Sequence, residues 1–278
     1  NINPNEKWEK SHRDETFQTM HKLLDEAIAL NPDLILWPES AVTSHLRLSY
    51  SDRNPIQKKV ESSGIPLLAG TVDRSVDQSG ETNYFNSTIM MYPDGKINMY
   101  HKVHLVPFAE YIPLSEYFPS LKKLNFGQGN FSKGKKFTVF HVDSVRFSNC
   151  ICYETSSPSI IRKFIKNGAQ FLSIQANDGW LGKSSGPYQH FELAKLRAVE
   201  NRISIVRCAN TGISGFILPT GEVTKRIPIG EKKVLMGEIS FWNGTSFYTR
   251  FGDIFPMICS GIFFIFLGYG CIIQYLKQ

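Results

Sequence analysis

The sequence predicts an α/β domain with mixed sheets, followed by one membrane-spanning helix, and three observations support this prediction. Short apolar runs alternate with amphipathic stretches over residues 1–242, as expected for strands interleaved with helices. Turn signals such as Pro93-Asp94-Gly95 join neighbouring runs into hairpins, so antiparallel strand pairs should accompany parallel ones. The last apolar run, over 254–273, contains no charged side chain.

In chain order, the first predicted element is an amphipathic helix over 14–30, which Asn31 and Pro32 end. The apolar run 34–37 then predicts a strand buried on both faces, which presents Glu39 at its C-terminal end. The later elements are, in order, a strand over 66–70, a hairpin of strands 86–91 and 96–100, a strand over 146–152, a helix over 159–166, a strand over 171–176, a helix over 188–201, and strands over 203–208, 214–218 and 234–239.

The apolar run 254–273 is long enough, as a helix, to span the ~30 Å hydrocarbon core of a bilayer. Its proline and glycines are tolerated in membrane helices but weaken soluble ones. We therefore expect an α/β domain over 1–242, a connector over 243–253 and a transmembrane helix over 254–273. The alternative for this run is a helix buried in a soluble core. Because the chain opens without an initiator Met or a signal-like stretch, we expect a fragment or a processed product.

The charge balance and the cysteines exclude several classes of function. There are 31 Lys and Arg residues against 25 Asp and Glu, a net charge of +6. The basic residues are scattered among acids, which disfavours nucleic acid as a partner. Five cysteines without a CxxC pair argue against a disulfide framework or a zinc site. We therefore expect no metal and no other cofactor, and any special cysteine should act as a thiol.

Two candidate reactive residues follow predicted strands, where α/β proteins place reactive groups. Glu39 comes directly after an apolar run and Pro38, which presents it rigidly and suits it to proton transfer. The alternative is a capping or loop carboxylate. Lys102 follows a hairpin strand, and as a buried ammonium it would stabilise a developing oxyanion. Taken alone, a solvated surface lysine is the better interpretation.

The third candidate is Cys152, at the end of the predicted strand 146–152. Strand periodicity places Cys150 on the same face, but only Cys152 reaches the strand end, where its sulfur would emerge into a cleft. A thiolate is a strong nucleophile once a base or cation is near. Taken alone, a buried inert cysteine is commoner. A Cys–His pair also stays open, because four histidines are available: His101, His104, His141 and His190.

Together the three motifs are more specific than each is alone. Trp-Pro-Glu39, His-Lys102 and Ile-Cys152-Tyr-Glu, in this order, resemble the Glu-Lys-Cys triad of the nitrilase superfamily. Further motifs make essentially the whole chain similar to the apolipoprotein N-acyltransferase family: Val-Pro-Phe-Ala-Glu110-Tyr-Ile-Pro, Asn177-Asp-Gly-Trp180, Arg197-Ala-Val-Glu200-Asn-Arg202, Asn210-Thr-Gly212 and Arg250-Phe-Gly-Asp253. The resemblance implies a nitrilase-like αββα sandwich with mixed sheets, followed by one transmembrane helix.

The resemblance also implies an activity and a role for each matched residue. An acyl chain would pass from a phospholipid to a cysteine thioester, and then to the N-terminal amine of a diacylglyceryl-cysteine in bacterial apolipoproteins. Cys152 would be the nucleophile, Glu39 the general base and Lys102 the cation that stabilises the tetrahedral intermediate. Supporting roles are implied for Glu110, which would hold the lysine or base, for the backbone N–H of Tyr153 at the oxyanion, for Glu154 beside the nucleophile, for Asn86 as an active-site asparagine, and for Trp180 at the lipid entrance.

The implied location is the bacterial inner membrane, with the catalytic domain on the periplasmic side. The implied partners are a phospholipid acyl donor, a diacylglyceryl apolipoprotein acceptor and the membrane itself. Members of the family carry several membrane helices before the nitrilase-like domain, so a truncated chain or a separate N-terminal membrane portion is expected. Two alternatives remain. One is a nitrilase-type amidase or carbamoylase that hydrolyses a small amide, and the other is a membrane-tethered binding module without activity.

Overall fold

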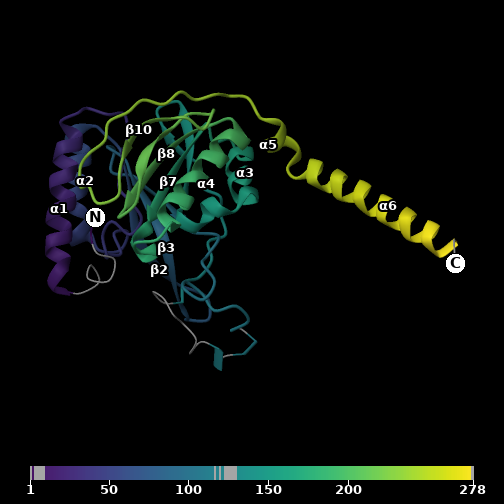
Figure 1. The fold of residues 1–278 in the computed structure, drawn as a ribbon. Helices are drawn as coiled ribbons and strands as arrows, with labels where there is room; N and C mark the ends of the chain where they lie inside the picture. Colours follow the sequence, from purple (N-terminus) through teal and green to yellow (C-terminus); the bar gives the residue numbers. More distant parts are fainter. Residues whose placement is uncertain (1, 3–9, 116, 119, 122–129, 277–278) are drawn as a thin grey trace.

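The computed structural model describes residues 2, 10–115, 117, 118, 120, 121 and 130–276, and two facing β-sheets form its centre (Figure 1). The four-stranded sheet has the order β1-β2-β3-β4 and the six-stranded sheet the order β10-β9-β8-β7-β6-β5. The strands are β1 (Ile35–Leu36), β2 (Leu67–Val76), β3 (Thr82–Met91), β4 (Ile97–His101), β5 (Phe140–Val142), β6 (Val145–Ile151), β7 (Phe171–Asn177), β8 (Ser204–Asn210), β9 (Ser214–Ile217) and β10 (Val223–Ile227).

Both sheets are mixed, as the sequence predicts. The pairs β1–β2, β6–β7 and β7–β8 are parallel, whereas the hairpin pairs β2–β3 and β3–β4 are antiparallel. The parallel pairs have buried residues on both faces, because helices cover the outside of each sheet. The carboxyl ends of β1 and β6 therefore open toward the same region between the layers, which is where a site is expected.

Helices cover the two outer faces, which completes a layered α/β sandwich (Figure 1). α1 (Lys10–Ile28) and α2 (Tyr50–Ser63) lie on the four-stranded sheet, while α3 (Pro158–Lys166) and α4 (Gly186–Asn201) lie on the six-stranded sheet. Two short 3-10 helices, η3 (Cys152–Ser156) and η4 (Asp178–Leu181), directly follow β6 and β7. Consequently the chain turns sharply at the two strand ends that carry Cys152 and Asp178.

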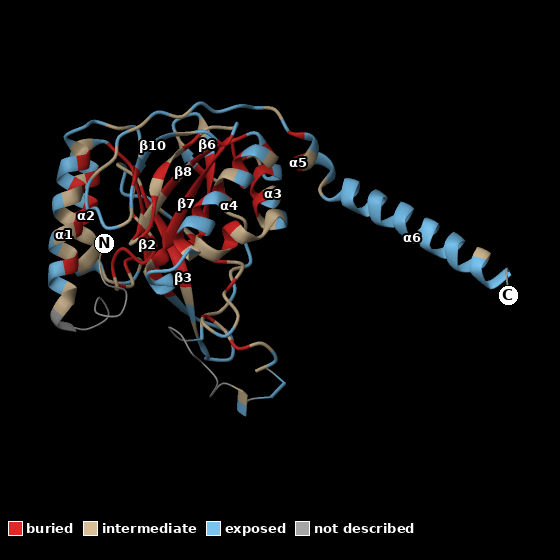
Figure 2. Ribbon diagram, in the orientation of Figure 1, coloured by how far each residue is buried: buried red, intermediate tan, exposed pale blue. Residues whose placement is uncertain are grey.

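The apolar core has two parts, one on each side of the four-stranded sheet. The first joins α3 and α4 to the six-stranded sheet and reaches Leu68 and Met90 across the interface between the sheets. The second packs Leu24 of α1 and Ile56 of α2 against the other face of the four-stranded sheet. Figure 2 shows the buried residues concentrated in the strands and on the inner helix faces. Burial of this apolar area drives the layers together.

The structure departs from the predicted elements at residues 234–239 and at α2. The expected strand 234–239 is wrong, because in the described part of the chain this segment joins no sheet, and β10 takes the edge position beside β9. In this segment the carbonyl oxygen of Met236 instead accepts a hydrogen bond from the side chain of Lys225, whose Nζ lies 3.0 Å away. The sequence pattern also does not predict α2, because its only buried apolar residues are Ile56 and Val60.

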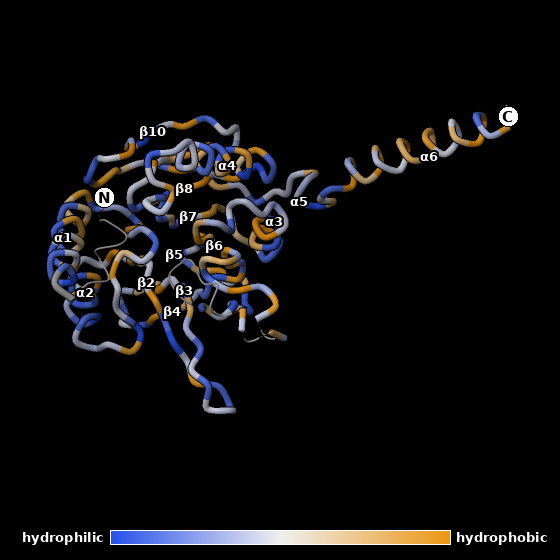
Figure 3. Tube along the Cα trace, turned by 60° about the horizontal axis from the view of Figure 1, so that its bottom comes forward, coloured by the Kyte–Doolittle hydropathy of each residue, from blue (hydrophilic) through white to orange (hydrophobic). Residues whose placement is uncertain are grey.

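The C-terminal helix α6 (Ile254–Leu276) projects away from the domain (Figure 1) and has no buried residue. It is apolar along most of its length (Figure 3). Its 23 residues and hydropathy of 2.0 make it long and apolar enough to cross a membrane. The alternative of a helix buried in a soluble core is wrong for this structure.

The short helix α5 (Phe247–Phe251) fastens the start of α6 to the domain. Arg162 of α3 donates through Nε to Thr249 O at 2.9 Å and through Nη2 to Arg250 O at 2.6 Å. Thr249 Oγ1 donates to Asn201 Oδ1 of α4 at 2.9 Å. The two arginine bonds satisfy carbonyls near the C-terminal end of α5, which the short helix leaves without partners.

Candidate active site

Five predicted site residues converge between the sheets, although they come from distant parts of the chain. Glu39 follows β1, Asn86 lies in β3, Lys102 directly follows β4, Glu110 lies in the next loop, and Cys152 begins η3 after β6. The exposed fractions of Glu39, Asn86, Lys102 and Glu110 are 7%, 2%, 1% and 6%. Buried charges must be paired, so this burial requires the contacts that follow.

The amide of Asn86 joins the two carboxylates. Asn86 Nδ2 donates to Glu39 Oε1 at 2.8 Å and to Glu110 Oε1 at 2.9 Å. Both amide hydrogens therefore point at carboxylate oxygens, and the amide oxygen has no partner among the described residues. This geometry supports the expectation that Asn86 belongs to the site.

Lys102 supplies the positive charge between these carboxylates. Its Nζ donates to Glu110 Oε1 at 2.9 Å and lies 3.8 Å from Glu39 Oε1. Burial disfavours the ammonium, but Glu110 and Glu39 outweigh this effect and raise the pKa of Lys102 above its ordinary value. Lys102 is therefore charged at neutral pH. The backbone N–H of Val106 completes the site by donating to Glu110 Oε2 at 2.8 Å.

Glu39 owes its position to a close approach between β1 and β2. A Cβ added to Gly70 would lie 2.2 Å from Pro38 O and 2.7 Å from Ser40 N. Only glycine allows β2 to approach this turn so closely. The N–H of Ala41 then donates to Gly70 O at 3.0 Å. The turn after β1 is thus fixed to β2, which holds the carboxylate toward Asn86 and Lys102.

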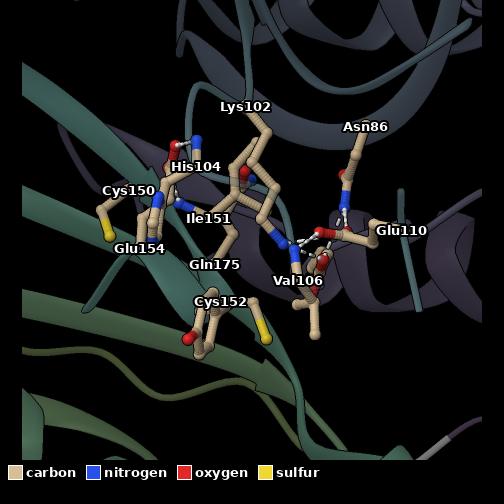
Figure 4. A network of polar contacts seen from close by, with 12 residues as sticks. Asn86, Lys102, His104, Val106, Glu110, Cys150, Ile151, Cys152, Glu154 and Gln175 are labelled. Carbon is tan, nitrogen blue, oxygen red and sulfur yellow. Dashed lines mark hydrogen bonds and ion pairs between the residues drawn. The ribbon is translucent and has the colours of Figure 1, made fainter. Parts of the chain in front are cut away.

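Cys152 leaves the strand that precedes it and turns its sulfur toward Lys102. Its φ is +49°, a left-handed conformation that is rare outside glycine. The expectation that Cys150 and Cys152 share a face is therefore wrong, because the alternation of the strand ends before Cys152. Figure 4 shows the Cys152 sulfur on the side of Val106 and Lys102, and the Cys150 sulfur pointing away.

The electrostatics of the site keep Cys152 in its thiol form at rest. Burial, together with the Glu39 carboxylate, raises the pKa of Cys152 well above its ordinary value, and the charge of Lys102 opposes this rise. A buried thiol of this kind becomes a nucleophile only when a base takes its proton. Glu39 is the carboxylate whose charge acts most strongly on this thiol, so it fits that role.

Glu154 ties the lysine loop to the cysteine turn. Its Oε1 accepts hydrogen bonds from Tyr100 Oη at 2.7 Å and from the backbone N–H of Val103 at 2.7 Å, and its Oε2 accepts from the N–H of Ile151 at 2.8 Å. The side chain is completely buried, and this burial raises the pKa of Glu154 to about 6. Figure 4 shows it beside His104, away from the Cys152 sulfur.

Sequence reasoning missed a buried amide that connects the two sheets. Gln175 of β7 donates through Nε2 to Trp37 O at 2.6 Å, just before Glu39. Its Oε1 accepts from Thr88 Oγ1 at 2.5 Å and from Asn149 Nδ2 at 2.9 Å. The available signal was a polar residue in the middle of the apolar run 171–176. The bridge fixes the end of β1 relative to β3 and β6.

The four histidines weighed as thiol partners do not contact the Cys152 sulfur in the described part of the chain. His190 contacts the backbone of Cys152 instead, because its Nε2 is 3.0 Å from the Cys152 carbonyl oxygen. His101 stacks on Phe85, and His104 stacks on Tyr153. His141 is exposed in β5. A Cys–His pair is therefore disfavoured relative to the arrangement with Glu39 and Lys102.

Trp180 and one large cleft are two further features of the described residues. Trp180, the predicted entrance residue, is 45% exposed in η4. A cleft of about 720 Å³ lies between α1, β1, β8 and residues 231–239, and its lining includes Trp37 and Cys208 but none of Glu39, Lys102 and Cys152. No three His, Cys, Asp or Glu side chains in the described ranges are grouped to hold a metal ion.

The chain is similar to bacterial proteins named apolipoprotein N-acyltransferase. It is 35% identical to the protein of Chlorobaculum tepidum, covering 94% of this chain and 54% of that protein. It is 36% identical to the protein of Geobacter metallireducens, covering 93% and 50% respectively. The chain thus spans about half the length of the curated relatives it matches.

The fold is similar to that of solved nitrilase-superfamily structures. Nit3 of Saccharomyces cerevisiae, a member of branch 10 of this superfamily, superposes with a TM-score of 0.60 at 20% identity, covering 79% of this chain and 82% of that one. An amidase from Nesterenkonia sp. gives 0.60 at 17% identity, covering 88% and 89%. The predicted nitrilase-like fold is thus confirmed. The family model for carbon-nitrogen hydrolase matches residues 2–246, nearly all of the sandwich, and the chain therefore belongs to the carbon-nitrogen hydrolase family.

Proposed function

We propose that this chain carries the catalytic centre of an apolipoprotein N-acyltransferase, with Glu39, Lys102 and Cys152 as its catalytic residues. The proposal is carried by the surroundings of the Lys102 ammonium. This group bonds to Glu110 at 2.9 Å and lies 3.8 Å from Glu39, and the Cys152 sulfur points toward the same side of the site as Lys102 (Figure 4). The names of the relatives, which are apolipoprotein N-acyltransferases, supply the substrate class.

In the first half-reaction Glu39 takes the proton of the Cys152 thiol, and the sulfur attacks the ester carbonyl of a phospholipid. The carbonyl oxygen becomes an oxyanion, which Lys102 and the backbone N–H of Tyr153 stabilise. The ester C–O bond then breaks, and Glu39 returns the proton to the departing lysophospholipid oxygen. The products are an acyl thioester on Cys152 and a lysophospholipid.

In the second half-reaction the α-amine of a diacylglyceryl-cysteine attacks the thioester carbonyl. Glu39 takes a proton from the attacking nitrogen, and the same two donors stabilise the oxyanion. The C–S bond breaks, the amide forms, and Cys152 regains its proton. Asn86 and Glu110 position the two charged groups throughout, and Glu154 holds the lysine loop against the cysteine turn.

The helix α6 fits this lipid chemistry. We assign residues 1–242 to the catalytic domain, 243–253 to the connector and 254–273 to the membrane-spanning part of α6, with the domain on the periplasmic side of the inner membrane. Both substrates carry acyl chains, and each CH2 drawn from the bilayer into water costs ~0.8 kcal/mol. A domain anchored at the interface avoids most of this cost, and we assign Trp180, which is 45% exposed, to the lipid entrance.

Mass spectrometry of the intact chain tests the proposal. After incubation with phosphatidylethanolamine vesicles, we expect one acyl adduct on wild type and on Cys150→Ala, and none on Cys152→Ala. The Cys150 sulfur points away from Lys102, so it serves as the matched control. An adduct with a small amide and none with lipid would instead support the amidase. Absence of both adducts would support a binding module.

A further inference from the structure

A second cluster of buried polar side chains lies behind Cys152, and the proposed chemistry does not use it. Asp178 begins η4, His190 lies in α4 and Arg207 lies in β8. Their exposed fractions are 1%, 9% and 1%. Burial of three ionisable side chains is costly unless they satisfy one another, so the cluster requires a structural or functional reason.

Asp178 holds the ring of His190 from behind. Its Oδ1 lies 2.7 Å from His190 Nδ1, and Arg207 Nη2 donates to its Oδ2 at 2.9 Å. Arg207 is fixed in turn, because its Nη1 donates to Ile213 O at 2.8 Å. A Cβ on Gly212 would lie 2.2 Å from Asp178 Oδ2, so the glycine leaves room for the carboxylate.

The other ring nitrogen of His190 contacts the backbone of the nucleophile. Its Nε2 lies 3.0 Å from the carbonyl oxygen of Cys152. A carbonyl oxygen can only accept, so Nε2 carries the hydrogen and donates it. Cys152 has a φ of +49°, and a non-glycine residue holds such a conformation only where surrounding contacts enforce it. The His190 bond is one such contact.

The peptide unit between Cys152 and Tyr153 contains both this carbonyl and the Tyr153 N–H, and in the proposed mechanism that N–H stabilises the oxyanion. The described chain has no cis peptide bond, so the Tyr153 N–H points away from the Cys152 carbonyl and hence away from His190. A hydrogen bond to a carbonyl draws electron density from the amide nitrogen, which makes its N–H a stronger donor. His190 thus acts on this donor through one peptide bond.

We propose that Asp178 and His190 are positioning residues that orient and polarise the Cys152–Tyr153 peptide, so that its N–H stabilises the oxyanion. The inference rests on the proposed function, since it takes Cys152 as the nucleophile and the Tyr153 N–H as a donor to the oxyanion. It assigns a role to residues of the Asn177-Asp-Gly-Trp180 motif, and to a histidine that the sequence offered only as a partner for the thiol.

Two isopolar variants separate this role from simple packing. In His190→Gln the amide nitrogen takes the place of Nε2 and can still donate to the Cys152 carbonyl. In His190→Asn it takes the place of Nδ1, keeps the contact with Asp178 and does not reach the carbonyl. His141→Asn, at an exposed position of β5, is the control.

Each variant of the full chain is measured in two reactions of Cys152. Acylation by p-nitrophenyl butyrate passes through an oxyanion, and mass spectrometry detects the butyryl thioester. Alkylation by iodoacetamide displaces iodide and forms no oxyanion. We expect His190→Asn to slow acylation about 10- to 100-fold while alkylation changes less than about threefold. We expect His190→Gln and His141→Asn to stay within about threefold of wild type in both reactions.

Several outcomes would overturn the inference. These are an unchanged acylation rate in His190→Asn, an equal loss of acylation and alkylation, and a His190→Gln variant as slow as His190→Asn. Circular dichroism monitors folding, and if His190→Asn unfolds, His190→Met provides a second side chain without a donor and carries the same expectation. A wild-type chain that reacts with p-nitrophenyl butyrate but not with phospholipid would contradict the proposed function alone.

Discussion

At the scale of single residues, Lys102 is the group on which the site depends. It is 1% exposed, and the carboxylates of Glu110 and Glu39 keep it charged. Removing Glu110 would leave the buried ammonium with only Glu39, 3.8 Å away, to compensate its charge, which is far more costly than losing a surface ion pair. The two carboxylates are nevertheless not equivalent, because the backbone N–H of Val106 fixes Glu110, whereas Glu39 accepts from the side chain of Asn86.

This difference predicts the effect of changing the proposed base. Glu39→Gln keeps an oxygen that accepts from Asn86, but an amide cannot take the proton of the Cys152 thiol. We expect S-acylation to slow by ~10²–10⁴-fold with little change in folding. The rate of thioester formation, followed by mass spectrometry, checks this. Glu61→Gln, on the exposed side of α2, is the control, and an unaltered rate in Glu39→Gln would remove Glu39 from the mechanism.

Glu154 predicts a dependence of stability on pH. Burial raises its pKa from 4.5 to about 6, so the folded protein binds more protons than the unfolded chain between these values. The contribution of Glu154 to the free energy of unfolding, about 2 kcal/mol, is therefore present below pH ~4.5 and is lost as the pH rises through ~6. Glu154→Gln lacks this dependence. Unfolding in denaturant at several pH values should show wild type losing stability relative to the variant over that range, and a constant difference would contradict the assignment.

The sequence indicates the residues of the proposed catalytic centre more directly than the residues that position them. Glu39, Lys102 and Cys152 follow strand ends and carry distinctive motifs, so their type and position in the chain suffice. Gln175 and His190 act through contacts with backbone carbonyls, at Trp37 and Cys152. Every residue has a backbone carbonyl, so the residue types in the sequence do not indicate which carbonyl a side chain will contact. Such residues can therefore be identified only in the folded structure.

At the scale of elements, the close contact of β2 with the turn after β1 decides where Glu39 lies. The sequence predicts both strands but not their approach, because a lone glycine in a strand has several interpretations. The wrong prediction of a strand over 234–239 has a related cause. Alternating apolar residues do not show whether the edge of a sheet is available for pairing, and β10 occupies the edge beside β9. In the structure that segment packs Gly237 against the ring of Phe216.

The contact at Gly70 gives a prediction at this scale. Gly70→Ala places a Cβ 2.2 Å from Pro38 O, so the turn that carries Glu39 must move. Because displacements near 1 Å at a reacting group cost ~10²-fold, we expect acylation of Cys152 to fall by about that factor. Gly268→Ala, where a Cβ meets nothing within 4 Å, should leave the rate unchanged. Equal rates in the two variants would show that the turn adapts without consequence.

At the scale of the whole molecule, the sandwich and α6 are separable in their packing. No residue of α6 is buried against the domain, so its removal takes no side chain from either core. The sequence predicts a separate apolar helix here, because a run without charge differs sharply in composition from the sandwich.

This separation predicts the behaviour of a chain that ends at Asp253. We expect its melting temperature to stay close to that of the full chain, and its reaction with p-nitrophenyl butyrate to be retained. Binding to phosphatidylethanolamine vesicles, measured by flotation, should be lost together with acylation from lipid. Retained flotation would mean that another surface holds the domain to the bilayer.

The bonds from Arg162 to the carbonyls of Thr249 and Arg250 have a consequence for how the protein responds to its membrane. The proposed membrane-spanning part, residues 254–273, measures about 30 Å as a helix and so matches the ~30 Å hydrocarbon core, and a thinner bilayer would require α6 to incline. The guanidinium of Arg162 would then couple that inclination to α3, which begins two residues after the turn that holds Cys152. Bilayers whose lipids differ in acyl-chain length would thereby shift the turn that holds Cys152 to different extents.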